Sequence, residues 1–511
     1  MLARIASYGL SGLHGYAVSV EVDVSNGLPA FEMVGLPDAA VKESRERVRS
    51  AIKNSGYEYP ARRMTINLAP ADIRKEGPIY DLPMAVGILA ATGQIDAQKA
   101  QAIPMLGELS LNGEIRPVNG VLPMAIDAFA HGYTQLLLPE ENAAEASYIQ
   151  GLRVYAVQTL QQAEQFLNGR LPLQPYPSQT WHTEQISGVA AADFAQIKGQ
   201  QGAKRAMEIA AAGGHNILLI GPPGAGKTML ARALSGILPE LTFEEALEIT
   251  KIHSVAGQLH SSDHGLVHQR PFRAPHHSIS TAALTGGGLR ANPGEVSLAH
   301  YGVLFLDELP EFKRDALEAL RQPLEDGEVT VSRVNATVTY PASFMLAASM
   351  NPCPCGQFGH GECRCTPIQI RRYLNRISGP LLDRIDIQVE MGPVAYEHIA
   401  GDAQEESSAD VRQRVNQARR LQRERYQHDG IFYNAQLDNR LSHLYCKPDK
   451  QGELILQHAF TNMGLSARAY GRILKVARTI ADLEGSESLQ APHIAEAVQY
   501  RSLDRKYWGN E

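Results

Sequence analysis

Residues 216–228 read Asn-Ile-Leu-Leu-Ile-Gly-Pro-Pro-Gly-Ala-Gly-Lys-Thr, an apolar run of strand type that leads into a glycine-rich loop. A helix-forming stretch from Met229 to Leu234 follows. This order predicts a P-loop, in which successive backbone N–H groups and the first turn of the following helix face phosphate groups. Lys227 is expected to reach the β- and γ-phosphates of a nucleotide, and Thr228 to bind Mg²⁺. The residues expected to hold the nucleotide are Gly221, Pro222, Pro223, Gly224, Ala225, Gly226, Lys227 and Thr228.

Two further apolar runs end in polar residues that suit the same site. Residues 303–306 precede Asp307 and Glu308, and we expect Asp307 to hold Mg²⁺ through water and Glu308 to polarise the water that attacks ATP. Residues 345–348 lead to Asn351, which is expected to orient that water. The three runs are short and alternate with helical patterns, as in a parallel sheet whose strands end at one ligand-binding edge. The sequence therefore predicts an α/β P-loop ATPase core.

Phosphoryl transfer also requires positive charge beside the γ-phosphate in the transition state. Arg384, within Pro380-Leu-Leu-Asp-Arg, is predicted to be an arginine finger supplied to a neighbouring subunit. Arg468, at the start of a predicted helix, is predicted to be a second sensor. Surface ion pairing is the alternative for each. An arginine supplied in trans implies a ring of subunits.

Four of the five cysteines lie in one short glycine-rich segment. In a chain with so few cysteines, such clustering indicates metal binding rather than disulfides. We expect a closed tetrahedral Zn²⁺ site with a structural role, because four thiolates leave no open position for water. His360 is a substitute ligand in this interpretation, and reduced thiols without metal are the alternative. The predicted ligands are Cys353, Cys355, Cys363 and Cys365.

Two segments combine features that suit a phosphate backbone in a ring pore. The first, residues 271–278, is aromatic and basic and precedes a glycine-rich stretch, while the second, residues 329–339, alternates like a hairpin. Ordinary surface loops are the alternative for both. The predicted DNA contacts are Arg273, His276, His277 and Arg333.

Length and pattern predict three domains in a chain of 511 residues. Strand-like runs at 17–24 and 64–68 and helical patterns at 39–54 and 82–91 indicate an N-terminal α/β domain. The predicted boundaries are 1–167 for that domain, 168–188 for a proline-rich linker, 189–393 for the ATPase core and 394–511 for a helical C-terminal domain.

The composition, 44% hydrophobic and 20% charged, is typical of soluble globular protein. A net charge of −7 confines any nucleic-acid contact to local loops. Residues 1–13 have no long apolar core of signal-peptide type, and no later stretch reaches the length needed to span a bilayer. We therefore expect a cytoplasmic protein without a membrane partner.

The order of these motifs resembles that of the magnesium-chelatase-like AAA+ ATPases, most closely the ComM/YifB subfamily. Phe272-Arg-Ala-Pro-His-His277 and Cys353-Pro-Cys-Gly356 are specific to that group. The resemblance implies a homo-hexameric ring that threads single-stranded or branched DNA, and a role in branch migration during recombination or natural transformation, together with recombination proteins. It also implies that Ile197 and Gln200 lie beside the adenine and that the C-terminal helices form a lid.

The N-terminal part resembles the Lon proteolytic domain, of the S5 domain 2-like fold, in residues 67–78 and 137–142. Lon proteases carry a nucleophilic serine and a lysine at the positions that Ile79 and Leu122 occupy here. Because a Ser/Lys dyad needs both groups, we expect no peptidase activity, and the domain is expected to bind a partner or DNA.

Three other functions are weighed against a DNA translocase. A magnesium-chelatase-type motor for metal insertion into a porphyrin is the main alternative, although the chain lacks the Asp-x-Ser-x-Ser motif of the partner subunit in that system. A Lon-type protease is disfavoured by the missing dyad. A transcription-activating ATPase is disfavoured because no helix-turn-helix pattern is present.

Overall fold

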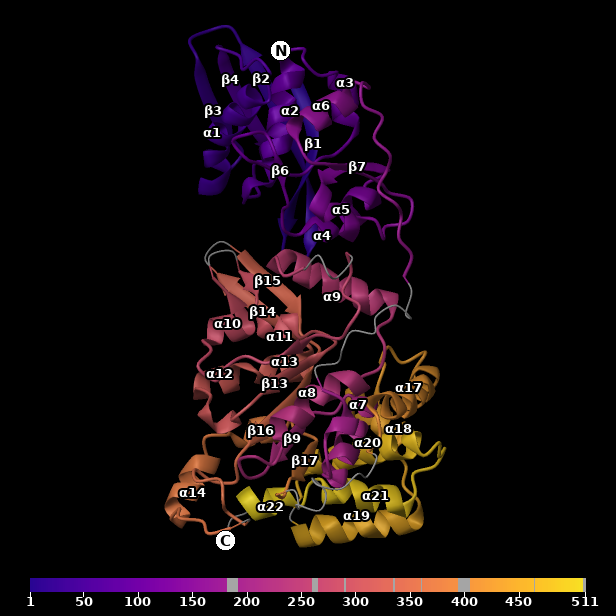
Figure 1. The fold of residues 1–511 in the computed structure, drawn as a ribbon. Coiled ribbons are helices and arrows are strands. Elements are labelled where there is room, and N and C mark those ends of the chain that lie inside the picture. The colour runs from indigo at the N-terminus through magenta and orange to yellow at the C-terminus, as the bar shows by residue number, and fades with distance from the viewer. Residues whose placement is uncertain are drawn as a thin grey trace. The chain divides into compact units, whose positions relative to one another are not determined.

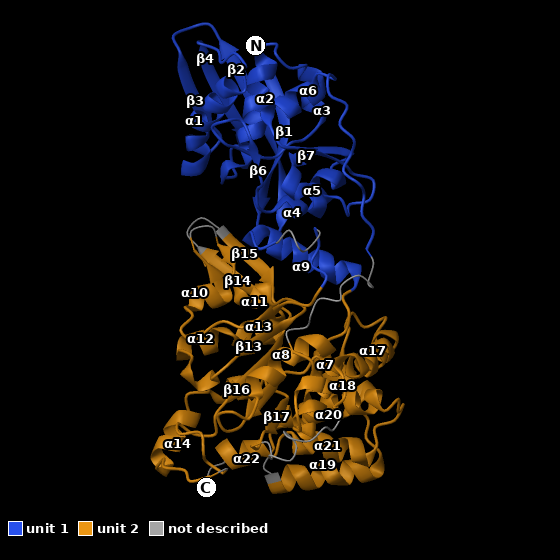
Figure 2. Ribbon diagram, viewed as in Figure 1, with its two compact units in different colours: residues 1–184, 242–268 blue, residues 185–241, 269–511 orange. Residues whose placement is uncertain are grey.

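The computed structural model describes residues 1–181, 192–259, 265–288, 291–333, 336–359, 361–393, 405–463 and 465–508. The chain forms two compact units, which Figure 2 shows in different colours. The first contains residues 1–184 and 242–268, and the second contains residues 185–241 and 269–511. Among the described residues, no helix is both long enough and apolar enough to cross a membrane.

The first unit is built on a four-stranded sheet in the order β1-β2-β4-β3 (Figure 1). Its strands are β1 (Leu2–Ser11), β2 (His14–Ser25), β3 (Ala30–Val34) and β4 (Arg63–Ala69). Strand β2 pairs antiparallel with both β1 and β4, with Leu2 opposite Asp23, and β3 runs parallel to β4. The strands predicted at 17–24 and 64–68 are thus confirmed, each slightly longer than its apolar run.

Helices and short strands cover this sheet. All eleven residues of α2 are buried, and it packs against β1 and β2, where a Cβ atom at Gly87 would lie 2.7 Å from Val22. Helix α1 begins after Asp38, whose carboxylate accepts a hydrogen bond from the Val41 N–H at 2.7 Å. The remaining elements are α1 (Ala39–Asn54), α2 (Asp81–Ala91), α3 (Ala97–Ala102), β5 (Glu108–Leu109), β6 (Ile115–Arg116), α4 (Val121–Ala130), β7 (Gln135–Pro139), α5 (Glu140–Ala146), β8 (Arg153–Val157) and α6 (Leu160–Leu167).

Helix α9 (Phe243–Ala256) belongs to the first unit, although the chain before and after it belongs to the second. It packs on α4, where the N–H of Gly120 donates to the Ser254 carbonyl at 3.0 Å. The sequence-based boundaries place residues 242–268 in the ATPase core, because the amphipathic pattern of a helix does not reveal which unit covers its apolar face. The predicted linker contains no helix or strand from residue 168 to 181, and residues 182–188 lie outside the described part.

Glu145 is fully buried where α5, α4 and α9 meet. Its carboxyl group accepts hydrogen bonds from the Ser254 hydroxyl at 2.7 Å, the Asn142 amide at 2.8 Å and the Leu122 N–H at 3.1 Å. Burial raises the pKa of Glu145 from its ordinary value of 4.5 to about 7, and the three donors only partly offset this effect.

The second unit contains a five-stranded sheet in the order β10-β13-β16-β9-β17, and every pair in it is parallel. The strands are β9 (Ile217–Ile220), β10 (Phe272–Arg273), β13 (Val303–Leu306), β16 (Met345–Met350) and β17 (Ile387–Glu390). All residues of β9, β13 and β16 are buried, as expected for a parallel sheet covered on both faces. The predicted α/β core with a parallel sheet is confirmed.

The prediction that residues 271–278 form a loop is wrong for Phe272 and Arg273. These two residues form the edge strand β10, and the Phe272 ring stacks on Phe305 of β13 with centroids 6.0 Å apart. A two-residue strand has too little periodicity to be recognised from sequence.

Helices surround the sheet, and the described residues from 408 to 508 are mostly helical, as predicted (Figure 1). The antiparallel hairpin of β14 (Glu328–Arg333) and β15 (Ala336–Pro341) is also present. The helices are α7 (Gln201–Gly213), α8 (Lys227–Ile237), α10 (Thr281–Thr285), α11 (Glu295–Leu298), α12 (Arg314–Ala319), α13 (Arg321–Asp326), α14 (Pro367–Leu374), α15 (Gly379–Leu382), α17 (Ser408–Arg425), α18 (Asn439–Tyr445), α19 (Lys450–Met463), α20 (Ala467–Leu483), α21 (Ala491–Gln499) and α22 (Leu503–Trp508).

The raised pKa of Glu145 predicts a pH-dependent stability. Between pH 4.5 and about 7 the folded state binds more protons than the unfolded state, so the free energy of unfolding falls as pH rises and the full cost is present above pH 7. Glu145→Gln is expected to remove this slope. Its free energy of unfolding, compared with that of the wild type, should therefore be higher at pH 8 than at pH 5 by on the order of 1–3 kcal/mol. Thermal unfolding of both proteins across this range measures the effect. Glu141→Gln, an exposed change on the same helix, is the control and should retain the wild-type slope. A slope in Glu145→Gln equal to that of the wild type would contradict the attribution of the pH dependence to Glu145.

Candidate nucleotide-binding site

The P-loop connects the carboxyl end of β9 to α8. The Lys227 ammonium donates to the carbonyls of Gly221 at 2.7 Å and Pro222 at 2.9 Å, and to Oδ1 of Asn351 at 3.0 Å. Burial lowers the pKa of Lys227, while the carboxylates of Asp307 and Glu308 act in the opposite direction. The amine therefore lies buried at the loop and is paired with groups that carry no full charge.

The backbone of the loop forms an open cradle. Gly224 and Gly226 have φ values of +80° and +86°, and a Cβ atom at either position would meet nothing within 4 Å. A Cβ atom at Gly221, in contrast, would lie 2.5 Å from the Met391 carbonyl. Glycine is thus required by conformation at two positions and by close packing at the third.

The strand β13 delivers Asp307 to the same edge of the sheet. Its Oδ2 accepts a hydrogen bond from the Thr228 hydroxyl at 2.8 Å, and its Oδ1 accepts one from the hydroxyl of Ser349 at the end of β16. The two residues predicted to bind Mg²⁺ are therefore in direct contact. Ser349 is not among the residues predicted from the sequence, although its position next to Met350 in a buried strand is the signal that could have indicated it.

Glu308 has a left-handed backbone, with φ 55° and ψ 48°. Such a conformation is uncommon outside glycine and is often found at functional sites. The side chain is 58% exposed, and its Oε2 lies 3.4 Å from Nδ1 of His277. The His276 ring lies against His277 with centroids 4.0 Å apart. His277, predicted from sequence as a DNA contact, thus contacts the residue predicted to polarise water.

Ile197 and Gln200 lie before α7. Gln200, with φ 56°, donates from Nε2 to the carbonyls of Gly392 at 2.7 Å and Ala225 of the P-loop at 3.4 Å. Ile197 is buried, and its carbonyl accepts from Lys204, which also pairs with Glu405 at 2.8 Å. Gln200 is therefore attached to the P-loop by a hydrogen bond, and its place beside the adenine stays a prediction.

Arg384 and Arg468 lie at the opposite edge of the sheet from the P-loop. The Arg384 carbonyl accepts a hydrogen bond from Asn216, which immediately precedes β9, whereas the P-loop follows β9. The intervening strand spans roughly 10 Å at about 3.3 Å per residue. Arg468, 74% exposed, pairs with Asp383 at 3.4 Å and therefore lies at the same edge as Arg384.

Arg384 is held by a carboxylate of its own chain. Its guanidinium pairs with Glu325 and donates to the Pro380 carbonyl at 2.7 Å. The hydrogen bond from Arg384, its charge and that of Arg468 lower the pKa of Glu325. Arg384 and Glu325 border a cavity of about 480 Å³ that Arg321 and Thr330 also line.

Of the predicted DNA contacts, the side chains of Arg273, His276 and His277 lie in the described part. Arg273 makes a bidentate ion pair with Glu295, at 2.6 and 2.8 Å, so its charge is balanced within the unit. His276 is exposed, and its Nδ1 is 2.9 Å from the Ser278 hydroxyl. Arg333 is the last residue of β14, opposite Ala336, and its side chain lies outside the described part.

The four clustered cysteines are brought together. One Sγ atom from each of Cys353, Cys355, Cys363 and Cys365 lies within 4.8 Å of all the others. None of them forms a disulfide. His360, the substitute ligand named from the sequence, lies outside the described residues.

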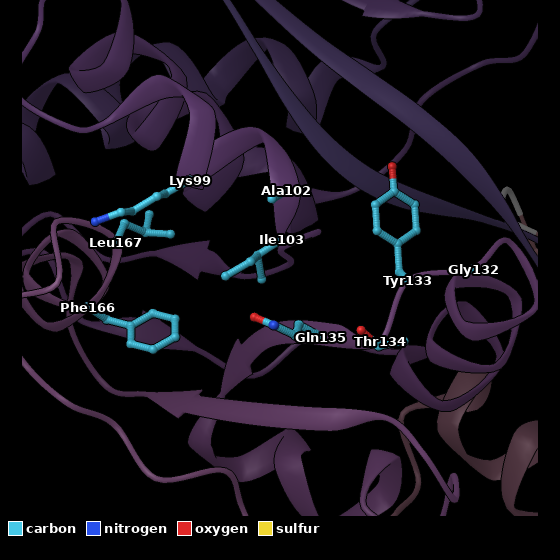
Figure 3. Close-up of a pocket in the computed structure, with 9 residues that line it drawn as sticks. All are labelled: Lys99, Ala102, Ile103, Gly132, Tyr133, Thr134, Gln135, Phe166 and Leu167. Carbon is cyan, nitrogen blue, oxygen red and sulfur yellow. The ribbon is translucent and has the colours of Figure 1, made fainter.

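The first unit contains a different kind of cavity, of about 480 Å³, which Figure 3 shows with its nine lining residues. It lies between α3, α6 and the start of β7, and its lining is mostly apolar, with Lys99 the one charged group among these nine residues. The lining therefore offers space for a ligand but no pair of groups for acid–base chemistry.

Comparison with known proteins gives the class of the chain. The family profile described as "Magnesium chelatase, subunit ChlI" matches residues 193–399, "Subunit ChlI of Mg-chelatase" matches residues 20–142, and "Magnesium chelatase, subunit ChlI C-terminal" matches residues 405–501. The chain belongs to the magnesium-chelatase-like AAA+ ATPases, in the ComM/YifB subfamily.

The relatives cover nearly the whole chain. The chain is 48% identical over 508 residues to "Competence protein ComM" of Haemophilus influenzae, covering 99% of this chain and 98% of that protein. It is 47% identical over 500 residues to "Uncharacterized protein YifB" of Escherichia coli, covering 97% and 96%. A 175-residue match to "Lon protease 2" of Bacillus subtilis, at 29% identity, covers 31% of each chain and shows partial similarity to Lon.

The residues at the P-loop fit the ATP and Mg²⁺ that this family implies. The open cradle at Gly224 and Gly226 provides N–H groups for phosphate oxygens. The buried Lys227 ammonium has neutral partners that a phosphate would replace with charge. Thr228 and Asp307 supply adjacent oxygen ligands of the type that Mg²⁺ prefers.

Lys227→Ala is expected to weaken binding of a fluorescent ATP analogue by about 10–100-fold, because it removes charge-assisted hydrogen bonds to phosphate. Titration with the analogue in Mg²⁺ measures the dissociation constant without requiring hydrolysis. Lys42→Ala, at an exposed position of α1, is the control and should bind as wild type does. Unchanged affinity in Lys227→Ala, with the fold intact by circular dichroism, would exclude the P-loop as the phosphate site.

Proposed function

We propose that this protein is a ring-forming ATPase of the ComM type whose hydrolysis of ATP drives movement on DNA. The observation that supports the ATPase activity is the convergence of Lys227, Asp307 and Asn351 at one sheet edge. Mg²⁺ bound there would neutralise phosphate charge during transfer. A similar group of residues forms the active site of P-loop ATPases in general.

Each residue has a defined task in this proposal. Lys227 binds the phosphates and is kept in place by the P-loop carbonyls and Asn351. Thr228 and Asp307 hold Mg²⁺. Glu308 accepts the proton of the attacking water, and Asn351 orients that water, since both follow strands that end at this edge.

The positions of Arg384 and Arg468 support a shared active site. Both lie at the amino end of β9 and β17, on the far side of the sheet from the P-loop of the same chain. An arginine at that edge meets a γ-phosphate when a second subunit presents its P-loop to it. We therefore propose that both act on the nucleotide of a neighbouring subunit, and that the ring is a homo-hexamer.

Mixing two inactive variants tests this arrangement. Arg384→Ala is expected to lower turnover by about 10³-fold or more, as for arginine fingers elsewhere, while nucleotide binding persists. In a mixture with Lys227→Ala, the Lys227→Ala subunits supply an intact Arg384 to the Arg384→Ala sites, so activity should reappear. Steady-state ATPase assays of each variant and of the mixture measure this. The exposed Arg420→Ala is the control, and a mixture as inactive as its components would show that Arg384 acts within its own subunit.

DNA as the substrate is supported by similarity to a protein named for competence and by one contact. His277 belongs to the segment predicted to bind DNA, and it lies 3.4 Å from Glu308. DNA that displaces His277 would release Glu308 to act on water. In this proposal, binding at residues 271–278 controls hydrolysis, and the role of the cycle is branch migration in transformation or recombination.

ATP turnover is expected to rise with single-stranded or forked DNA, and Glu308→Gln should lose turnover by about 10²-fold or more with and without DNA. His277→Ala should hydrolyse ATP at a rate that no longer depends on DNA. Steady-state ATPase assays on preparations with the same oligomer mass measure both effects, with a substitution at an exposed position, His428→Ala, as the control. A wild-type rate indifferent to every DNA tested would contradict the DNA translocase and favour the second candidate.

The second candidate is a motor for metal insertion into a porphyrin. It is supported by the three family profiles, which describe a magnesium-chelatase subunit. Peptidase activity is not proposed, because Ile79 and Leu122 are both apolar and buried.

A further inference from the structure

The cysteine loop, defined here as residues 352–366, lies between Asn351 and α14. Its described residues form no helix or strand. The Sγ–Sγ distances are 3.4 Å for Cys353–Cys355, 3.7 Å for Cys353–Cys363 and 3.6 Å for Cys355–Cys363. These separations are too long for a disulfide, whose bond is about 2.05 Å. The gathering of four thiols therefore points to a shared ligand rather than to covalent pairing.

The distances agree with one tetrahedral metal ion. Zinc–sulfur bonds of about 2.3 Å give a tetrahedron whose edges are roughly 3.8 Å. All four Sγ atoms lie within 4.8 Å of one another, a spacing that fits a single ion rather than the several irons of a cluster. The Phe358 N–H points to Sγ of Cys353 at 3.4 Å, a hydrogen bond of the kind that stabilises a metal-bound thiolate.

The cysteine loop packs directly on the P-loop. A Cβ atom at Gly356 would lie 2.9 Å from Cγ of Pro223 and closer still to its Cδ, so the backbones approach with no room for a side chain. Asn351, which bonds Lys227, immediately precedes the loop. Two residues of the nucleotide site therefore depend on where this loop lies.

The other side of the cysteine loop meets α22. The rings of Phe358 and Tyr507 are 6.2 Å apart in an edge-on arrangement. The Tyr507 hydroxyl donates to Glu390 of β17 at 2.7 Å, and Trp508 donates to the Leu374 carbonyl at the end of α14 at 3.4 Å. The cysteine loop thus connects the P-loop, the central sheet and the last described helix.

We propose that Cys353, Cys355, Cys363 and Cys365 bind one Zn²⁺ and that this ion holds the cysteine loop against Pro223, so that the P-loop and Asn351 are positioned for nucleotide. The ion is structural, since its four ligands leave no open coordination position. The proposed effect of the ion on nucleotide binding rests on the proposed ATPase function, whereas the presence of the ion does not.

Metal content tests the site without reference to activity. Protein purified without chelators is expected to contain one zinc per chain by mass spectrometry, with zinc–sulfur distances of about 2.3 Å by X-ray absorption. Cys355→Ser and Cys363→Ser should lose most of the zinc, and Cys446→Ala, which changes the fifth cysteine outside the cluster, should keep it. Iron in place of zinc, or no metal even after incubation with Zn²⁺, would overturn the site.

Two glycine variants test the link to the nucleotide. Gly356→Ala and Gly359→Ala impose the same backbone strain, because φ is +79° and +80°. Only Gly356→Ala clashes with Pro223, since a Cβ atom at Gly359 meets nothing closer than Lys506 at 3.7 Å. Gly356→Ala should bind the ATP analogue at least about tenfold more weakly than Gly359→Ala while both retain zinc. Equal affinities would overturn the role in positioning.

Removing the ion from wild-type protein completes the test. Thiol-reactive release of zinc, followed by readdition, should weaken and then restore binding of the ATP analogue, with the sheet intact by circular dichroism. Affinity that is unchanged by loss of zinc would overturn the positioning role while leaving the metal site. If untreated wild-type protein does not bind the ATP analogue at all, this result would instead contradict the proposed ATPase function, whatever the zinc content of the protein.

Discussion

Parallel pairing of β9 with β16 and β17 is the constraint on which the nucleotide site depends. The register aligns Ile217 with both Ala347 and Ile387, so the three strands end together, although β16 begins two residues earlier at Met345. The P-loop and Asn351 therefore leave the sheet at one edge, and Arg384 precedes it at the other. A shift of one residue along β16 would separate Asn351 from Lys227 and turn each side chain to the opposite face. The same pairing keeps Arg384 away from the P-loop of its own chain, and this separation supports the proposed site shared between subunits.

The carboxylates at this edge are controlled by different surroundings. Asp307 is fixed by hydroxyl groups of Thr228 and Ser349, while Glu308 is exposed and contacts only the ring of His277 among the described interactions at its side chain. A side chain that must accept a proton from water benefits from such freedom, and a metal ligand benefits from a fixed position. The left-handed backbone at Glu308 turns the chain directly after Asp307, so that the two consecutive carboxylates lie in different surroundings. Sequence order alone does not distinguish these surroundings.

Much of the fold was predictable because its signals are local. The strands β9 and β13 have the bounds of their apolar runs, and α1 has the bounds of its helical pattern. The P-loop residues and Asp307 follow from spacing, since a buried strand that runs into Gly-x-x-x-x-Gly-Lys-Thr or into paired acids is typical of a phosphate-binding core. The edge strand at Phe272 was missed because two residues carry no period, and the place of α9 was missed because packing partners are not encoded locally.

The contacts that sequence could not provide are those between distant segments. Ser254 bonds Glu145, and His277 meets Glu308, although no motif joins either pair. In both cases the residue type was visible and its partner was not. His277 shows the consequence, because its motif indicated a DNA contact while the structure places it beside a predicted catalytic group. A motif names a chemistry, and only the fold assigns the atom on which that chemistry acts.

The cysteine loop shows how such an assignment is stabilised. Ordering a peptide costs about 1–2 kcal/mol per residue in backbone entropy, so ordering residues 353–365 costs roughly 13–26 kcal/mol. With several glycines and mostly exposed or half-buried side chains, the loop has little apolar surface to bury. Structural zinc contributes roughly 10–16 kcal/mol in small peptides, which is the right magnitude. At its contact with Pro223 the loop gains no energy from side-chain packing, because Gly356 has no side chain and no room for one. The proposed metal ligation would supply order without volume at that contact.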